Sequence, residues 1–168
     1  MMIIFKNNAM KFYNYLILAL IFLVTSCNPF DYSPYEVPQL KQSETNLNSK
    51  NIEKILNSTD VESQGFNFAV VSDSHIEYSN LKDFVNDVNM DKDIRFVVHL
   101  GDMTDAGLSK EYIWTNEIMT ALKAPYVMVV GNHDYISNGG LIYEKMFGVS
   151  SFSFSYNNTK FVFFDDIF

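Results

Sequence analysis

The sequence predicts an α/β fold built around a parallel sheet. Three short apolar runs, residues 66–72, 94–100 and 126–130, have the composition of strands, and segments with helical periodicity separate them. Strand–helix–strand order implies right-handed crossovers and parallel pairing. Ligands of such sheets bind at the carboxyl ends of the strands, and a polar residue follows each of these three runs within two positions.

The first two strands are predicted to flank an amphipathic helix. We expect residues 66–72 to form a buried strand and residues 94–100 to form the second one. Between them, residues 80–90 have apolar side chains at i, i+3, i+4 and i+7, namely Leu81, Phe84, Val85 and Val88. This spacing is typical of a helix with one face against the sheet.

A second helix is predicted over residues 110–123, with Ser109 as its N-cap. One face of this helix carries Tyr112, Thr115, Met119 and Leu122. Pro125 ends it and the third strand follows at 126–130. Further along, residues 152–156 and 160–166 alternate in polarity around Asn157-Asn158, which indicates a β-hairpin.

The N-terminus has the pattern of an export signal. Lys6 and Lys11 accompany an apolar run at residues 12–24, which is short for a membrane span of about 20 apolar residues. The following "VTSC" resembles the lipobox of bacterial lipoproteins, so we expect a signal peptide over 1–26 and lipidation of Cys27. The alternatives are an ordinary secretory signal with an incidental cysteine, or an uncleaved anchor helix. The lipoprotein interpretation places the protein outside the cytoplasm, lipid-anchored to the bacterial cell envelope.

Residues 27–50 are predicted to be an extended tether, because three of the four prolines and many polar residues lie there. A short helix is expected over 49–58, with Ile52, Ile55 and Leu56 on one face. The folded domain is therefore assigned to residues 51–168.

The charge balance argues against a nucleic-acid partner. The formal net charge is −8, whereas phosphate backbones are bound by clusters of Lys and Arg. Arg95 is the only arginine, so a guanidinium clamp for a phosphate group is nearly excluded. An anionic substrate would have to be received by another cation.

Ligand-type residues follow all three strands at a regular interval. Asp73, Asp102 and Asn132 are separated by 29 and 30 residues, each one strand–helix unit. The three clusters are "SDSH" with Asp73 and His75, "GDMTD" with Asp102 and Asp105, and "GNHD" with Asn132, His133 and Asp134. Their side chains should therefore meet along one rim of the sheet.

Converging carboxylates repel each other unless a cation lies between them. His75 adds an imidazole and Asn132 a neutral carbonyl oxygen, a donor set without thiolate that suits Mn²⁺, Fe or Zn²⁺. Taken singly, each cluster is equally well explained by helix caps and turns. A purely structural domain with polar turns is thus an alternative, which the register of three clusters disfavours.

The motif order D-x-H, G-D-x-x-D and G-N-H-D resembles the calcineurin-like metallophosphoesterases over residues 66–168. The segment "KAPYVMVVGNHD" is also similar to that family. The resemblance implies a four-layer α/β/β/α sandwich that hydrolyses phosphoesters with a hydroxide activated by two divalent metal ions. We expect residues 51–168 to form the N-terminal half of such a sandwich.

The resemblance also implies roles for individual residues. The metal ligands would be Asp73 and His75 on the first ion, Asp102 bridging both ions, and Asn132 on the second. His133 would be the catalytic group, protonating the leaving oxygen or stabilising the transition state, and Asp134 would orient it. His99 is expected to be a core histidine, and Asp105 a cap or loop carboxylate rather than a ligand.

The family's pattern continues with a further histidine and a G-H-x-H pair, whereas this chain has only His75, His99 and His133. We therefore expect the chain to be C-terminally truncated, with incomplete metal shells. The alternative is a non-catalytic surface lipoprotein that keeps the fold but not the chemistry.

Overall fold

The computed structural model describes residues 11–18, 33–58 and 65–167. The chain divides into two units, Met1–Ser33 and Pro34–Phe168. In the first unit, residues 11–18 are helical with exposed side chains. None of the helices in the described ranges is long and apolar enough to cross a membrane. Cys27 and most of the predicted signal lie outside these ranges, so both remain predictions.

The second unit contains the predicted parallel sheet. Its strands are β1 (Asn67–Val71), β2 (Ile94–His99) and β3 (Tyr126–Met128), in the order β1-β2-β3. Both pairs are parallel, so the carboxyl ends of the three strands lie at one edge. The α/β class and the parallel topology predicted from the sequence are confirmed.

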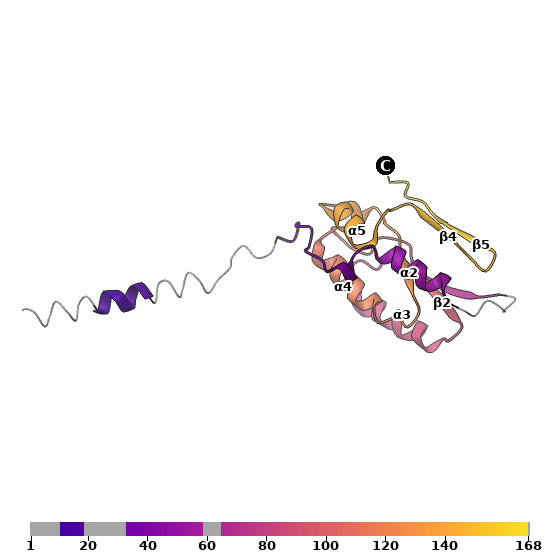
Figure 1. Ribbon diagram of the computed structural model, residues 1–168, viewed down its shortest axis with the longest axis horizontal. Helices are drawn as coiled ribbons and strands as arrows, with labels where there is room; N and C mark the ends of the chain where they lie inside the picture. The colour runs from indigo at the N-terminus through magenta and orange to yellow at the C-terminus, as the bar shows by residue number, and fades with distance from the viewer. Residues whose placement is uncertain (1–10, 19–32, 59–64, 168) are drawn as a thin grey trace, which may run out of the picture. The chain divides into compact units, whose positions relative to one another are not determined.

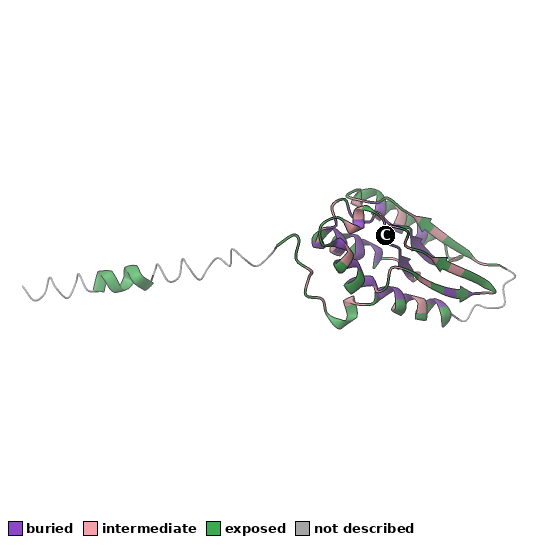
Figure 2. Ribbon diagram, turned by 90° about the horizontal axis from the view of Figure 1, so that it is seen from above, coloured by how far each residue is buried: buried purple, intermediate pink, exposed green. Residues whose placement is uncertain are grey.

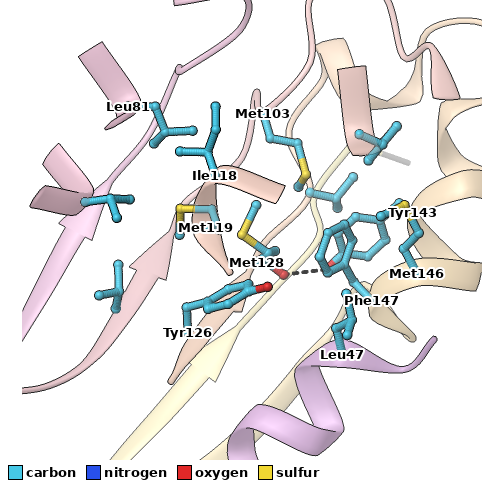
Figure 3. Packing of buried hydrophobic residues seen from close by; sticks show 14 of the residues in the cluster. Leu47, Leu81, Met103, Ile118, Met119, Tyr126, Met128, Tyr143, Met146 and Phe147 are labelled. Atoms are coloured by element: carbon cyan, nitrogen blue, oxygen red, sulfur yellow. Dashed lines mark hydrogen bonds between the residues drawn. The ribbon is translucent and has the colours of Figure 1, made fainter. Parts of the chain in front are cut away.

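One face of the sheet is covered by α3 (Tyr78–Met90) and α4 (Ser109–Met119) (Figure 1). The buried cluster on this face joins both helices to the strands (Figure 3). Its central members are Leu81, Val85, Val97, Tyr112, Met119 and Met128. Leu81 and Val85 lie on the apolar stripe predicted for the first helix, because residues four apart share a helix face.

The opposite face is covered by a hairpin of β4 (Phe152–Tyr156) and β5 (Thr159–Phe163), which pair antiparallel. Asn157 and Asn158 have φ of 45° and 61°, the left-handed conformation of a two-residue hairpin turn. Phe96 of β2 is fully buried against the hairpin, with ring centroids 5.7 Å from Phe154 and 5.2 Å from Phe161. The described residues thus form a helical layer, a parallel sheet and a second sheet.

The first strand is less buried than the sequence suggests. Phe68 is 41% exposed and Val70 is 46% exposed, so the expectation of a buried strand is wrong. The reason is topological: β1 lies at the edge of the sheet, whereas the central strand β2 is buried over its last four residues. The buried residues of the second unit, in purple in Figure 2, lie in its interior, and the exposed ones, in green, lie on its outer faces. An apolar run does not by itself distinguish an edge strand from a central one.

The N-terminus of α4 is capped by Glu111 rather than by Ser109. The carboxylate of Glu111 accepts hydrogen bonds from the backbone N–H of Ala106 at 3.1 Å and of Leu108 at 3.0 Å. The hydroxyl of Ser109 instead donates to the carbonyl oxygen of Pro34 at 3.0 Å. Ser109 is therefore the first helical residue, and its predicted role as N-cap is wrong.

Residues from Pro34 onward belong to the compact unit. A short 3-10 helix, η1 (Gln42–Glu44), precedes α2 (Leu47–Leu56). Asn48 is buried and pairs with the free edge of β3: its amide nitrogen donates to Met128 O at 2.8 Å, and Met128 N donates to its Oδ1 at 2.8 Å. Although 27–50 is predicted to be a tether, its second half is therefore anchored to the sheet.

A further helix, α5 (Gly139–Phe147), follows the 3-10 helix η2 (His133–Tyr135) and was not expected from the sequence. Its buried side chains include Ile142, Tyr143, Met146 and Phe147, a helical spacing that the sequence does carry. The Ser-Asn-Gly-Gly stretch at residues 137–140, which includes the first two residues of α5, has the composition of a loop and obscures the start of the helix. Tyr143 fixes α5 to the sheet, because its hydroxyl donates to Met128 O at 2.7 Å (Figure 3).

Candidate metal centre

The loops that follow β1 and β2 are joined by backbone hydrogen bonds. The N–H of Asp73 donates to Gly101 O at 3.1 Å, and the N–H of His75 donates to Asp102 O at 3.0 Å. These bonds continue the parallel pairing of the strands past their ends. They bring the "SDSH" and "GDMTD" clusters together as the register predicts.

The loops that follow β2 and β3 are in direct contact through two glycines. A Cβ on Gly101, whose φ is 104°, would lie 2.7 Å from Gly131 N. A Cβ on Gly131 would overlap Asp102 N and Oδ1. Neither position has room for a side chain, so glycine is required for the two loops to approach this closely.

Three of the four predicted ligands have left-handed backbones. The φ angles are 53° at Asp73, 39° at His75 and 51° at Asp102. A non-glycine residue in this region costs about 1–3 kcal/mol and persists only where surrounding contacts hold it. Strain of this kind clusters at functional sites, and the sequence gives no direct signal of it.

Asp73, His75 and Asp102 converge on one point. Each offers a ligand atom, and these atoms lie within 4.8 Å of one another. Nδ1 of His75 is 3.1 Å from Thr104 O. A carbonyl oxygen can only accept, so Nδ1 carries the proton and Nε2 keeps a free lone pair. Two carboxylates and an imidazole in this tautomer fit a divalent cation such as Mn²⁺, Fe²⁺ or Zn²⁺.

The structure places Asn132 beside the same carboxylates. An open hollow of about 480 Å³ is lined by Asp73, Asp102 and Asn132, and by residues 162–164, 166 and 167 at the end of β5 and just after it. Asn132 is exposed at the start of η2. Its assignment as a ligand remains a prediction.

The ring of His133 faces His75, with centroids 4.7 Å apart. Its backbone N–H donates to Asp102 Oδ1 at 2.9 Å, and its Nδ1 lies 2.8 Å from Asp105 O. The hydrogen bond to this carbonyl raises the pKa of His133, and the carboxylates of Asp102, Asp105 and Asp134 raise it further. In the metal-free protein these contacts favour the protonated form of the His133 imidazole.

Asp105 is closer to the site than expected for a loop carboxylate. His75, Asp105 and His133 form a second group with ligand atoms within 4.8 Å. The Asp105 carboxylate is 3.8 Å from Nδ1 of His75 and 56% exposed. It faces solvent at the edge of the centre, and its interpretation as a non-ligand remains a prediction.

Asp134 is fully buried and holds the second and third loops together. Its carboxylate accepts from Gly131 N at 2.9 Å, Thr104 N at 2.9 Å, Thr104 Oγ1 at 2.8 Å and Met103 N at 3.4 Å. Burial raises the pKa of Asp134 to about 6, although these donors oppose the shift. The role expected of Asp134 was to orient the His133 ring, whereas these bonds go to backbone and hydroxyl groups.

His99 is buried at the end of β2, as expected for a core histidine. Its ring is hydrogen-bonded to Ser74 and Gly101. Burial lowers the pKa of His99 to about 4, so the ring is neutral. The sequence analysis missed the contribution of Ser74 and Thr104. Serine and threonine are common in loops, and only the hydrogen bonds to His99 and Asp134 reveal the role of these two hydroxyls.

Comparison with known proteins agrees with this geometry. The family model for the calcineurin-like phosphoesterases matches residues 66–168, which include all three loops. No match was found among the curated proteins. The matched segment is more than half of the chain, so this protein belongs to the calcineurin-like phosphoesterase family.

Proposed function

We propose that this protein hydrolyses phosphoesters with two divalent metal ions held at the carboxyl edge of its parallel sheet. The observation that carries the proposal is the convergence of Asp73, His75 and Asp102 within 4.8 Å. These residues come from two different loops and have strained backbones, an arrangement that a plain turn does not require.

Asp73 and His75 would hold one ion, Asn132 the other, and Asp102 would contact both. Asp102 suits this position because a carboxylate offers two oxygens and a negative charge. When bound, divalent metals supply Lewis-acid activation of water and neutralise charge on the phosphoryl group. The cations would thus perform the task for which other proteins use arginine.

The position of the single arginine supports the proposal that metal ions, rather than arginine, would receive the phosphoryl group. Arg95 lies in the first half of β2, at the opposite end of the strand from Asp102. In a parallel sheet that end faces away from the ligand-binding edge. Arg95 is therefore poorly placed to receive a phosphate at the metal centre.

His133 would act as the proton donor to the leaving oxygen. Its Nδ1–H donates to Asp105 O, so the imidazolium form carries its second proton on Nε2. This Nε2 proton is the one that His133 would transfer to the leaving oxygen. Asp134 would assist by fixing the loop that carries His133 and Asn132.

We also propose that the protein is exported and anchored to the cell envelope through lipidated Cys27. The support is the sequence pattern alone, namely Lys6 and Lys11, the apolar run 12–24 and the lipobox-like "VTSC". Mass spectrometry of the purified protein should find acyl groups on Cys27 at a new N-terminus, and Cys27→Ser should lack them. An unmodified Cys27 in the wild type would exclude the lipid anchor.

The proposed activity is tested with p-nitrophenyl phosphate and bis(p-nitrophenyl) phosphate in the presence of Mn²⁺, Fe²⁺ or Zn²⁺. His133→Asn should lower kcat about 10²- to 10⁴-fold, the usual contribution of a general acid, and leave Mn²⁺ affinity nearly unchanged. Asp87→Asn, on the exposed face of α3, is the control. Absence of phosphate release with every metal would favour a non-catalytic surface protein.

A further inference from the structure

The buried ring of His99 has a polar partner on each nitrogen. Nε2 lies 2.9 Å from Oγ of Ser74, and the backbone N–H of Gly101 donates to Nδ1 at 3.3 Å. Since Nδ1 accepts, the neutral ring carries its proton on Nε2 and donates it to Ser74. His99 thus joins the loop after β1 to the loop after β2 through a single side chain.

Each partner of His99 adjoins a proposed metal ligand. Ser74 lies between Asp73 and His75, and Gly101 immediately precedes Asp102. The ring therefore contacts the segments that present the ligands. Its position resembles that of a group behind a metal site, whose contacts set the orientation of the ligating side chains.

The backbone around Ser74 needs such support. Asp73 and His75, on either side of it, have φ of 53° and 39°. Strained residues on both sides of Ser74 persist only where surrounding contacts hold the segment. Ser74 is 7% exposed, and its hydroxyl bond to fully buried His99 provides that constraint.

We propose that His99 is a positioning residue that sets the separation of Asp73 and His75 from Asp102. The inference rests on the proposed metal centre. A histidine that only filled the core would affect the free energy of unfolding and leave metal affinity unchanged. The two roles are therefore separable by experiment.

The first test titrates the purified full chain with Mn²⁺. Ser74→Ala and His99→Asn both remove the Ser74–His99 bond, while Asn keeps an acceptor where Nδ1 lies. Each should weaken Mn²⁺ binding about 10- to 100-fold, the range for groups that orient metal ligands. The double variant should be no weaker than the single ones, because both remove one interaction. His99→Gln, which keeps a donor where Nε2 lies, should restore part of the affinity.

A matched control removes a buried hydrogen bond elsewhere in the same core. The hydroxyl of Tyr126 donates to Asn116 Oδ1 at 2.8 Å, at the start of β3. Tyr126→Phe should lower the free energy of unfolding and leave the Mn²⁺ dissociation constant within twofold of wild type. Equal loss of Mn²⁺ affinity in this control and in Ser74→Ala would overturn the proposal.

The second test measures amide hydrogen exchange in the metal-free protein. In Ser74→Ala and His99→Asn, the amides of Asp73 and His75 should exchange faster relative to the core amide of Val97. Unchanged Mn²⁺ affinity together with unchanged relative exchange would overturn the positioning role. If the wild type binds no Mn²⁺, the proposed function fails, and the exchange measurement alone decides the role of His99.

Discussion

The backbone N–H of His133 donates a 2.9 Å hydrogen bond to Oδ1 of Asp102. This bond connects the proposed proton donor to the proposed bridging carboxylate across two loops. It also leaves Oδ2 of Asp102 as the freer oxygen. Movement of either loop would therefore disturb the metal centre and the catalytic group together.

Gly131→Ala should damage the metal centre, because the new Cβ overlaps Asp102 N and Oδ1. We expect a loss of about 1–3 kcal/mol in the free energy of unfolding, typical of overpacking, and weaker Mn²⁺ binding. Urea unfolding and Mn²⁺ titration measure the two effects. Gly65→Ala is the control, since a Cβ there meets no atom within 4 Å. Wild-type Mn²⁺ affinity in Gly131→Ala would show that the glycine contact is not needed.

Thr104→Val tests the link between the second and third loops. The substitution keeps the shape but removes the hydroxyl that donates to Asp134 and accepts from Gly107 N at 3.2 Å. The loss of one of the four donors to Asp134, together with an unpaired Gly107 N–H, should cost about 1–3 kcal/mol in urea unfolding. Thr120→Val, at an exposed position after α4, should change stability by less. Equal effects of the two substitutions would contradict the role of the Thr104 hydroxyl.

Asn48→Ala tests whether the segment before the first strand is part of the domain. It removes both bonds to the backbone of Met128 and leaves a buried N–H at the free edge of β3. We expect urea unfolding to show a loss of about 1–3 kcal/mol from the unsatisfied Met128 N–H, because Met128 O keeps its bond from Tyr143. Asn80→Ala, at an exposed position of α3, is the control and should change the free energy of unfolding by less. A stability equal to wild type would show that the Asn48 bonds do not anchor this segment to the sheet.

The pH dependence of stability should reflect His99. Burial lowers its pKa from 6.5 to about 4, so between these values the unfolded chain binds more protons than the folded one. The contribution of His99 to the free energy of unfolding is fully present above pH 6.5. It falls by about 3 kcal/mol as the pH is lowered to 4. Asp134, with its pKa raised to about 6, contributes the opposite slope below that pH.

The contribution of His99 is isolated by comparison with His99→Asn in metal-free urea unfolding. Asp134 is present in both proteins, so its effect cancels in the difference. Wild type should lose its advantage over the variant as the pH falls from 6.5 to 4. A constant difference over this range would mean that the His99 pKa is not lowered.

Much of the fold follows from the sequence because its signals are local. The spacing of Leu81 and Val85 predicts α3, and Asn157-Asn158 predicts the hairpin turn, since both depend only on neighbouring residues. The regular interval between Asp73 and Asp102 predicts their convergence, because parallel strands share a carboxyl edge.

The remaining features depend on contacts between distant segments. The bonds of Asp134 to Thr104 and the pairing of Asn48 with β3 join residues 30 or more positions apart. The exposure of β1 depends on strand order, which an apolar run does not encode. The left-handed backbone of His75 is likewise imposed by its surroundings, because most histidines have negative φ even though histidine is enriched in the left-handed region.

The most direct test of the metal centre is the affinity of the full chain for Mn²⁺, compared between wild type, Asp102→Asn and the exposed control Asp87→Asn. Asparagine keeps the size of the side chain and removes its charge. Asp102→Asn should weaken binding by at least the roughly 10- to 100-fold seen when supporting groups of a metal site are lost, and Asp87→Asn should bind as wild type. Equal Mn²⁺ affinity in Asp102→Asn and wild type would contradict a metal centre built on these strand ends.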